Sequence, residues 1–271
     1  MRTPLILIMF AISIMACKKQ LPADPSSDAY VESQPPVLIP VTKSINADIG
    51  GYYVALPAHY QESSKKYPLL LFIHGGAQFG NGNSDLPLVL IDAIPELLDE
   101  KFFPANFAVD GKNYSFIVMA PQFIRYPYNN EVISAVTYAE ANYRIDTTRV
   151  YITGFSLGSV IAGYVCADYP SLFAALVSIG GITAVPAGAQ RMVDAKLPIW
   201  AFHNTDDELI DVSYTKNFVS LYNSLNPAIP ARLTIFPAFG LSNHDSWTKA
   251  TDPLYKEDGK NMYEWMLQYS R

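Results

Sequence analysis

The sequence predicts an α/β fold, a mostly parallel, doubly wound sheet flanked by helices in a single domain. From about Gly51 onward, short apolar stretches alternate with longer segments whose apolar residues have helical spacing. Several of the short stretches are continuously apolar, as strands buried on both faces of a parallel sheet should be. A chain of 271 residues, half of them apolar, is also long enough for one substantial core.

The predicted strands and helices alternate along the chain. The strands are YYVALP from Tyr52, PLLLFIHGG from Pro68, YSFIVMAP from Tyr114, RVYITG from Arg149, AALVSIGG from Ala174, LPIWAFH from Leu197 and RLTIFP from Arg232. Apolar residues at helical spacing predict helices within 132–143, 157–164, 214–225 and 262–269. This alternation favours the doubly wound arrangement, and no internal repeat or second domain is evident.

The N-terminus is typical of an export signal. Arg2 precedes an apolar segment, 4–16, that is too short to span a bilayer and ends in IMAC. This ending resembles the lipobox of bacterial lipoproteins, so residues 1–17 are expected to be a signal peptide ending at a lipidated Cys17. The protein would then be exported and attached by this lipid alone to a membrane, facing the periplasm or the cell surface. The alternative is an ordinary signal cleaved near Ala16, which would release a secreted soluble protein.

Residues 18–45 are predicted to be a proline-rich linker, and residues 46–271 the catalytic domain. The linker is polar and carries five prolines up to Pro40, a composition that buries too little apolar surface to fold. The net charge of −6 comes from scattered acids, which makes nucleic acid an unexpected partner. If Cys17 carries lipid, Cys166 has no intramolecular partner, and it is expected to be a buried, unreactive thiol.

Reactive side-chain types follow four of the predicted strands, in HGGAQFG, GFSLG, HNTDDELI and AFGLSNHDSW. Ligands of parallel α/β sheets bind beyond the carboxyl ends of the strands, so these segments are expected to form one site. GFSLG lies between a strand and a helix, which favours Ser156 as a nucleophile in a sharp turn. Gly154 and Gly158 would remove the Cβ atoms that collide in such a turn. The alternative is a serine that only caps the helix.

A serine hydroxyl attacks a carbonyl only when a base accepts its proton and an acid orients that base. Folds with this serine turn carry the acid and then the histidine later in the chain, and His244 is the only one of four histidines in that position. His74 and His203 stand at strand ends, where an imidazole commonly orders a loop. The acid is expected within 206–208, which has the sequence DDE.

An oxyanion that forms during attack needs backbone N–H donors. The N–H of Leu157 is one candidate, and the HGG turn supplies the other, Gly76 or its neighbour Ala77; the alternative is that HGG is only a flexible turn. Three further side chains near the strand ends are expected to line a substrate pocket, with packing as the alternative role: Gln122, Phe155 and Trp247.

Several stretches together resemble secreted α/β-hydrolase esterases of the phospholipase/carboxylesterase and feruloyl-esterase type, some of whose relatives are labelled "predicted peptidase". They are YPLLLFIHGG, FIVMAPQF, DTTRVYITGFSLGS, YPSLFAALVSIGG, LPIWAFHNTDDELI and NHDSWTKA, within roughly 51–271. The resemblance implies an α/β-hydrolase fold without a large lid domain and a reaction that needs neither metal nor organic cofactor. Their nucleophile matches Ser156, the acid of their HGxxD segment matches Asp207, and their histidine matches His244. Their oxyanion donors match Gly76 and Leu157.

The sequence departs from these relatives at several positions. HGGAQFG stands where HGAGERG is common, Asn204 and Asn243 replace glycines, and Ser159 stands where glycine is usual. None of these changes removes a reacting group, but the first leaves the substrate open. The expected function is that of a serine carboxylesterase, acting on feruloyl or acetyl esters of polysaccharide through an acyl-enzyme. The alternatives are a serine peptidase of the same fold and a non-catalytic surface binding protein.

Overall fold

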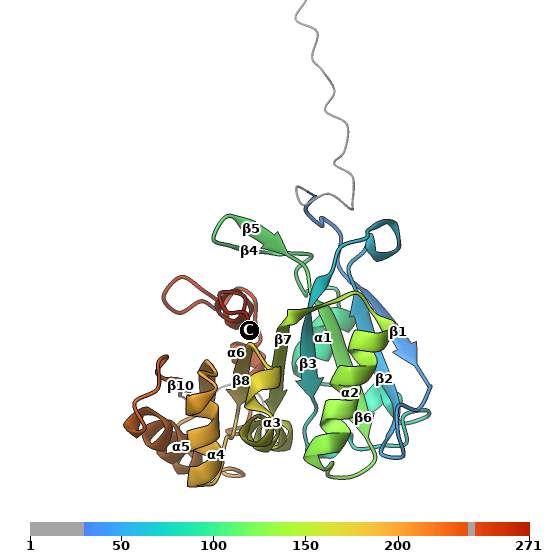
Figure 1. Ribbon diagram of the computed structural model, residues 1–271. Helices are drawn as coiled ribbons and strands as arrows, with labels where there is room; N and C mark the ends of the chain where they lie inside the picture. The colour runs from blue at the N-terminus through green and yellow to red at the C-terminus, as the bar shows by residue number, and fades with distance from the viewer. Residues whose placement is uncertain (1–29, 238–241) are drawn as a thin grey trace, which may run out of the picture.

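The computed structural model describes residues 30–237 and 242–271. These residues form one large sheet with helices on both of its faces (Figure 1). The sheet has eight strands in the order β1-β2-β6-β3-β7-β8-β9-β10. β2 pairs antiparallel with β1 and β6, and the other neighbouring strands are parallel. This mostly parallel sheet with its flanking helices is the α/β-hydrolase fold, which confirms the predicted fold class.

The elements have the following bounds. The strands are β1 (Val37–Val41), β2 (Ile49–Leu56), β3 (Tyr67–Ile73), β4 (Phe107–Val109), β5 (Lys112–Tyr114), β6 (Ile117–Phe123), β7 (Ile145–Phe155), β8 (Ala175–Ile179), β9 (Ile199–Asn204) and β10 (Arg232–Phe236). The helices are α1 (Ala93–Asp99), α2 (Asn129–Asn142), α3 (Leu157–Asp168), α4 (Pro186–Asp194), α5 (Val212–Ser224), α6 (Trp247–Ala250) and α7 (Met262–Met266). Short 3-10 helices are η1 (Tyr60–Glu62), η2 (Gly76–Gln78), η3 (Leu86–Leu90) and η4 (Pro170–Leu172).

Two apolar cores lie on opposite faces of the sheet. Along β3, Leu69 and Leu71 contribute to one core, together with residues of α2, α3, α4 and α5. Leu70 and Phe72 contribute to the other, together with residues of α1 and α7. Because successive side chains of a strand point to opposite faces, a continuously apolar strand fills both cores.

All seven stretches predicted as strands form strands of the large sheet, and the four predicted helices correspond to α2, α3, α5 and α7. The hairpin of β4 and β5 and the helices α1, α4 and α6 were not predicted. The two hairpin strands have three residues each and α6 has four, too few to show a periodic pattern. Between β8 and β9 lies only α4, as expected for a fold without a large lid domain.

The linker prediction is wrong at its C-terminal end. Residues 37–41 form β1, whose Val37 lies opposite Leu56 of β2. Pro40 is compatible with this strand because β1 is at the edge of the sheet, where a missing N–H costs no ladder hydrogen bond. Glu32 is also buried and accepts a hydrogen bond from the His59 ring. Residues 18–29 of the predicted linker, together with the signal peptide and Cys17, lie outside the described residues.

Cys166 lies in α3 and is fully buried. Burial raises the pKa of its thiol well above the ordinary value, because the thiolate would lose its hydration. The predicted burial of Cys166 is therefore confirmed. Within residues 30–237 and 242–271, no helix has the length and apolar content needed to cross a bilayer.

Candidate active site

Ser156 lies in a strained turn between β7 and α3, with φ at 53° and ψ at −127°. A residue other than glycine seldom adopts a positive φ, and such strain is concentrated at functional sites. A Cβ on Gly154 would collide with the carbonyl oxygens of Gly158 and Ile73, and a Cβ on Gly158 with those of Ile73 and His74. The predicted need for both glycines is confirmed, because β3 and α3 approach each other too closely for a methyl group.

Ser156, His244 and Asp207 form a hydrogen-bonded series, although they come from three separate loops. The Oγ of Ser156 lies 2.7 Å from Nε2 of His244, and Nδ1 of His244 lies 2.6 Å from Oδ2 of Asp207. A carboxylate can only accept a hydrogen bond, so the Nδ1 atom that faces Asp207 carries the hydrogen. Nε2 is then free to accept the proton of Ser156. His244 and Asp207 are buried, whereas Ser156 is half-buried.

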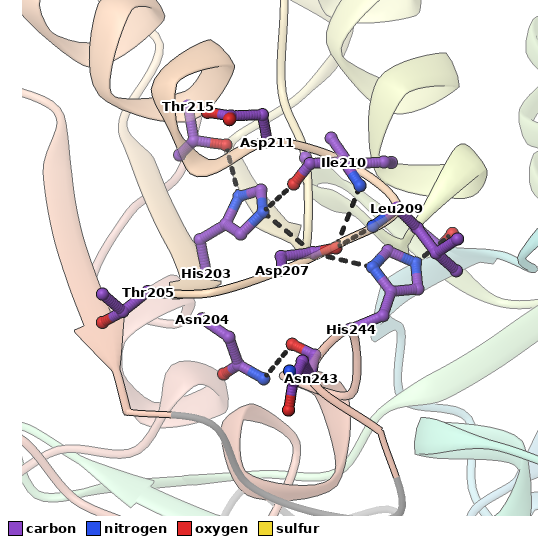
Figure 2. A network of polar contacts seen from close by, with 12 residues as sticks. His203, Asn204, Thr205, Asp207, Leu209, Ile210, Asp211, Thr215, Asn243 and His244 are labelled. Carbon is purple, nitrogen blue, oxygen red and sulfur yellow. Dashed lines mark hydrogen bonds and ion pairs between the residues drawn. The ribbon is translucent and has the colours of Figure 1, made fainter.

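The Asp207 carboxylate faces four hydrogen-bond donors, most of them visible in Figure 2. Oδ1 accepts the backbone N–H groups of Leu209 and Ile210, each at 2.9 Å. Oδ2 faces Nδ1 of His244 and also Nε2 of His203, at 3.0 Å. Its side chain is completely buried, so these donors replace the water that the carboxylate has lost.

The neighbouring acids of the DDE segment do not contact His244. Asp206 is exposed, and Glu208 is exposed with its Oε1 3.3 Å from the amide nitrogen of Asn243. The residues alone left three acids open, and the geometry assigns the contact with the histidine to Asp207.

Asn204 supports the segment that carries His244. Its amide nitrogen donates to the carbonyl oxygens of Asn243 and Asp245, at 2.9 and 3.0 Å, one on each side of His244. The Asp245 carboxylate then accepts the N–H of Thr248 in α6. The resemblance described above leads to an expectation of glycine at this position, and glycine has no side-chain amide to make these bonds. The contribution of Asn204 was visible in the sequence only as a departure from that expectation.

The two predicted oxyanion donors lie on adjacent turns. Gly76 is the first residue of η2 and Leu157 the first residue of α3, and N–H groups at such positions have no partner within their own helix. A methyl group on Gly76 would lie 3.5 Å from Cδ2 of Leu157, so the turns are in contact.

The turn at Gly76 is held by residues that the sequence analysis did not assign. The Gly75 N–H donates to Oε1 of Gln78 at 2.7 Å, and Nε2 of Gln78 donates to Asp92 at 3.0 Å. Asp92 also accepts the indole N–H of Trp247 at 3.2 Å. Burial raises the pKa of Asp92, because its charged form loses hydration. Through Asp92, the turn at Gly76 is linked to the helix that follows His244.

His74 and His203 order loops, as predicted for strand-end histidines. Nδ1 of His74 donates to the carbonyl oxygen of Gly75 at 2.8 Å, and Nε2 accepts the Phe123 N–H at 3.0 Å. Burial lowers the pKa of His74 to about 4, because a charged imidazole would be desolvated there. A neutral ring with one donor and one acceptor matches both partners.

Two of the three pocket predictions need correction. Gln122 is fully buried, and its amide nitrogen donates to the carbonyl oxygens of Gln78 and Asp85, while its oxygen accepts the Gly82 N–H. It fixes the loop after β3 and does not line a pocket, because its polar atoms are already bonded to backbone. Phe155 is also buried.

Phe155 belongs to the core under the site. Its ring packs against Phe72 and against Trp247, with centroids 6.0 and 4.5 Å apart. Trp247 is half-buried and lies edge-on to the His244 ring at 5.3 Å. Of the three residues predicted to line the pocket, Trp247 is the one that lies beside the Ser156–His244 pair.

The fold and this geometry define an α/β hydrolase scaffold with a serine, a histidine and an aspartate in hydrogen-bonded order. Known structures share the fold. A thermostable esterase aligns with a TM-score of 0.59 at 22% identity, over 87% of this chain and 63% of its own. A ferulic acid esterase aligns with a TM-score of 0.58 at 15% identity, over 81% of this chain and 98% of its own.

The sequence is similar to esterases as well. The family described as Phospholipase/Carboxylesterase matches residues 125–254, a stretch that includes Ser156, Asp207 and His244. Acetylxylan esterase A of Emericella nidulans is 38% identical over 102 residues, which are 30% of this chain and 32% of that enzyme. In two proteins described as probable acetylxylan esterase A, from Neosartorya fischeri and Aspergillus fumigatus, the match spans only 26% of the length of each relative.

Proposed function

We propose that this protein is a serine esterase that hydrolyses carboxylic esters. The observation that carries the proposal is the unbroken series from Oγ of Ser156 through His244 to Asp207, with distances of 2.7 and 2.6 Å. This is the arrangement that activates a serine hydroxyl. Its position at the carboxyl ends of parallel strands is where α/β sheets bind ligands.

The reaction begins when Oγ of Ser156 attacks the ester carbonyl carbon and its proton passes to Nε2 of His244. Asp207 stabilises the imidazolium and keeps the ring oriented. The carbonyl π electrons move to oxygen, and the N–H groups of Gly76 and Leu157 donate to the oxyanion. His244 then protonates the departing alcohol, which leaves the acyl group on Ser156.

Water completes the cycle. His244 removes a proton from a water molecule as it attacks the acyl carbon, and a second tetrahedral intermediate forms at the same donors. The bond to Oγ then breaks, Ser156 regains its proton from His244, and the carboxylic acid leaves. The groups named supply every proton transfer, so the proposal requires no metal or organic cofactor.

Acetyl or feruloyl esters of a polysaccharide are the proposed substrates. The similar proteins support this choice, because they include acetylxylan esterases by sequence and a ferulic acid esterase by fold. The proposal also retains export and lipid attachment at Cys17, based on the IMAC ending of the N-terminal apolar segment. Replacing Cys17 by alanine in the full chain should abolish incorporation of labelled fatty acid in a bacterial host.

A substrate panel tests the proposed activity. The purified protein is assayed with p-nitrophenyl acetate, longer p-nitrophenyl esters, methyl ferulate and a peptide p-nitroanilide. We expect turnover of esters and little turnover of the anilide. A preference for the anilide would support a serine peptidase, and turnover of no substrate would support a binding protein.

A further inference from the structure

The Asp207 carboxylate contacts a second imidazole that the mechanism above does not use. Nε2 of His203 lies 3.0 Å from Oδ2 of Asp207 and 2.9 Å from the carbonyl oxygen of Ile210, and Nδ1 lies 2.7 Å from Oγ1 of Thr215 (Figure 2). The His203 side chain is completely buried.

These contacts determine the protonation of His203. Both groups that face Nε2 are acceptors, so Nε2 carries a hydrogen. Nδ1 then accepts the hydroxyl hydrogen of Thr215, whose oxygen accepts the Ile182 N–H at 3.3 Å. Burial lowers the pKa of His203, in agreement with a neutral ring. The imidazole thus supplies a donor to Asp207 without adding a charge to the site.

We propose that His203 is a positioning residue that holds Oδ2 of Asp207 in line with Nδ1 of His244. The carboxylate cannot turn about its Cβ–Cγ bond without disturbing the two backbone bonds at Oδ1 and the two imidazole bonds at Oδ2. Removing His203 leaves Oδ2 with His244 alone, so the carboxylate can move away from the orientation that favours proton transfer. This role rests on the proposed function, since it acts through Asp207.

Three variants test the role, with kcat and KM measured on p-nitrophenyl acetate. His203→Ala should lower kcat by about 10- to 100-fold, as losses of comparable orienting partners do, while KM stays the same. His203→Gln should recover most of kcat, because its amide N–H can donate to Asp207. Thr215→Val should lower kcat severalfold, because Nδ1 loses the donor that fixes the ring.

Several results would overturn the role. A His203→Gln variant as slow as His203→Ala would mean that ring packing, not the donated hydrogen bond, matters. A His203→Ala variant with kcat within twofold of the wild type would exclude any positioning. If His203→Ala does not fold, Thr215→Val decides alone, and an unchanged kcat contradicts the role. A wild-type protein without ester hydrolysis would contradict the proposed function instead.

A separate surface feature lies beside α3 and the loop after β6. It is a groove of about 480 Å³ whose walls are rich in tyrosine. Its lining includes four tyrosines, Tyr126, Tyr128, Tyr164 and Tyr169, together with Asn130 and Asp168.

The outer face of α3 connects this groove with Ser156. Leu157, Val160, Tyr164 and Asp168 follow one another at helical spacing and are half-buried or exposed, while the other residues of α3 are buried. At about 1.5 Å per residue, Tyr164 lies roughly 12 Å along the helix from Ser156. The groove is therefore within reach of a long substrate whose ester group lies at the serine.

The groove offers aromatic rings and neutral polar groups. Tyr126 and Tyr128 are 44% and 69% exposed, and the Arg125 guanidinium lies 4.9 Å from the Tyr128 ring and covers one of its faces. The charge of Asp168 is paired with Arg191 at 2.8 Å. Exposed rings can stack on the C–H faces of sugars, and phenol and amide groups can bond to sugar hydroxyls. The chemistry suits a neutral glycan.

We infer that this groove binds the glycan chain of a polymeric ester, a few sugar units from the ester that Ser156 attacks. The inference rests on the proposed function, which takes a polysaccharide ester as substrate, and adds the surface that holds the glycan chain. It predicts that the groove contributes to turnover of the polymer and not to turnover of a small ester.

A double variant, Tyr126→Ala with Tyr128→Ala, tests the groove on acetylated xylan and on p-nitrophenyl acetate. We expect kcat/KM to fall by about tenfold on the polymer, comparable to the loss of two stacking contacts, and to stay within twofold on the small ester. Tyr214→Ala is the matched control, because Tyr214 is 60% exposed on α5, away from the groove. It should change neither value.

Binding gives a readout that does not depend on turnover. Affinity electrophoresis should show that Ser156→Ala is retarded by deacetylated xylan and that adding the two tyrosine substitutions removes the retardation. Absence of retardation, or equal losses on polymer and small ester, would overturn the groove assignment. Absence of all ester turnover in the wild type would contradict the proposed function and leave the binding result to be judged separately.

Discussion

Two regions of the site both contain histidine, but the ring nitrogens have different partners. We call the region of Ser156 and His244 the front, and the region of the buried His74 and His203 the back. At the front, His244 faces Asp207 with one nitrogen and the half-buried hydroxyl of Ser156 with the other. At the back, both nitrogens of His74 and His203 are bonded to groups within the fold. The same side chain is thus placed once beside a nucleophile and twice as a cross-link between loops.

This difference shows that the role of each histidine depends on the group that its second ring nitrogen faces. The free nitrogen of His244 faces the hydroxyl of Ser156, which is half-buried and can be reached by a substrate. The free nitrogen of His203 faces the buried hydroxyl of Thr215, and the nitrogens of His74 face backbone groups, so these two rings have no such reaction partner. Burial lowers the pKa of both His74 and His203, which keeps them uncharged at neutral pH. The front is therefore expected to control turnover, and the back to control orientation and stability.

Replacing Ser156 by alanine should have the largest effect, because it removes the nucleophile at the front. We expect kcat on p-nitrophenyl acetate to fall by roughly 10⁴- to 10⁶-fold, with the melting temperature close to that of the wild type. A variant that keeps more than a tenth of the wild-type kcat would show that the front is not the reacting centre.

Asp207→Asn should be the next largest loss, about 10⁴-fold in kcat, because a neutral amide neither selects the His244 tautomer nor stabilises the imidazolium. Pre-steady-state measurement of p-nitrophenol release would show whether acylation slows, as expected. If the variant retained most of its acylation rate, the contact at 2.6 Å would not serve as the acid of the series.

At the back, His74 should make stability depend on pH. Its pKa is about 4 in the fold and about 6.5 in the unfolded chain, so the unfolded state binds the proton more readily. The contribution of His74 to the free energy of unfolding is complete above pH 6.5 and is lost as the pH falls toward 4. The free energy of unfolding should decrease by about 3 kcal/mol over this interval. Urea unfolding at pH 7 and pH 4 measures this decrease.

His74→Gln provides the control for that measurement. The variant lacks the titrating ring, so its free energy of unfolding should fall by about 3 kcal/mol less over the same pH interval. An identical pH dependence in both proteins would mean that His74 is not held neutral by the fold.

Asp206→Asn should have the smallest effect, within twofold in kcat. Asp206 is exposed and does not contact His244, so its charge is screened by water. Parallel assays of Asp206→Asn and Asp207→Asn compare two adjacent acids directly. A large loss of kcat in Asp206→Asn would mean that Asp207 is not the acid that orients His244.

Much of the site could be predicted from local patterns. The turn at GFSLG follows from two glycines between a strand and a helix, and the two glycines are packed as that pattern requires. Gln122 and Phe155 could not be placed in the same way, because their position at a strand end is compatible with either a pocket or a core. Their actual neighbours, Asp85 for Gln122 and Trp247 for Phe155, are distant in the chain.

The sequence by itself determined the strand order along the chain, the serine turn and the order of serine, acid and histidine, because these depend on residue type and short spacing. The resemblance favoured Asp207 among the acids of the DDE segment, but only the tertiary structure brought its carboxylate against His244. Only the tertiary structure decided that Pro40 lies in an edge strand. It also decided that His203 shares Asp207. These outcomes depend on which loops meet, as with the Asp207–His244 contact between residues 37 positions apart. Local spacing carries no information about such pairs until the sheet brings them together.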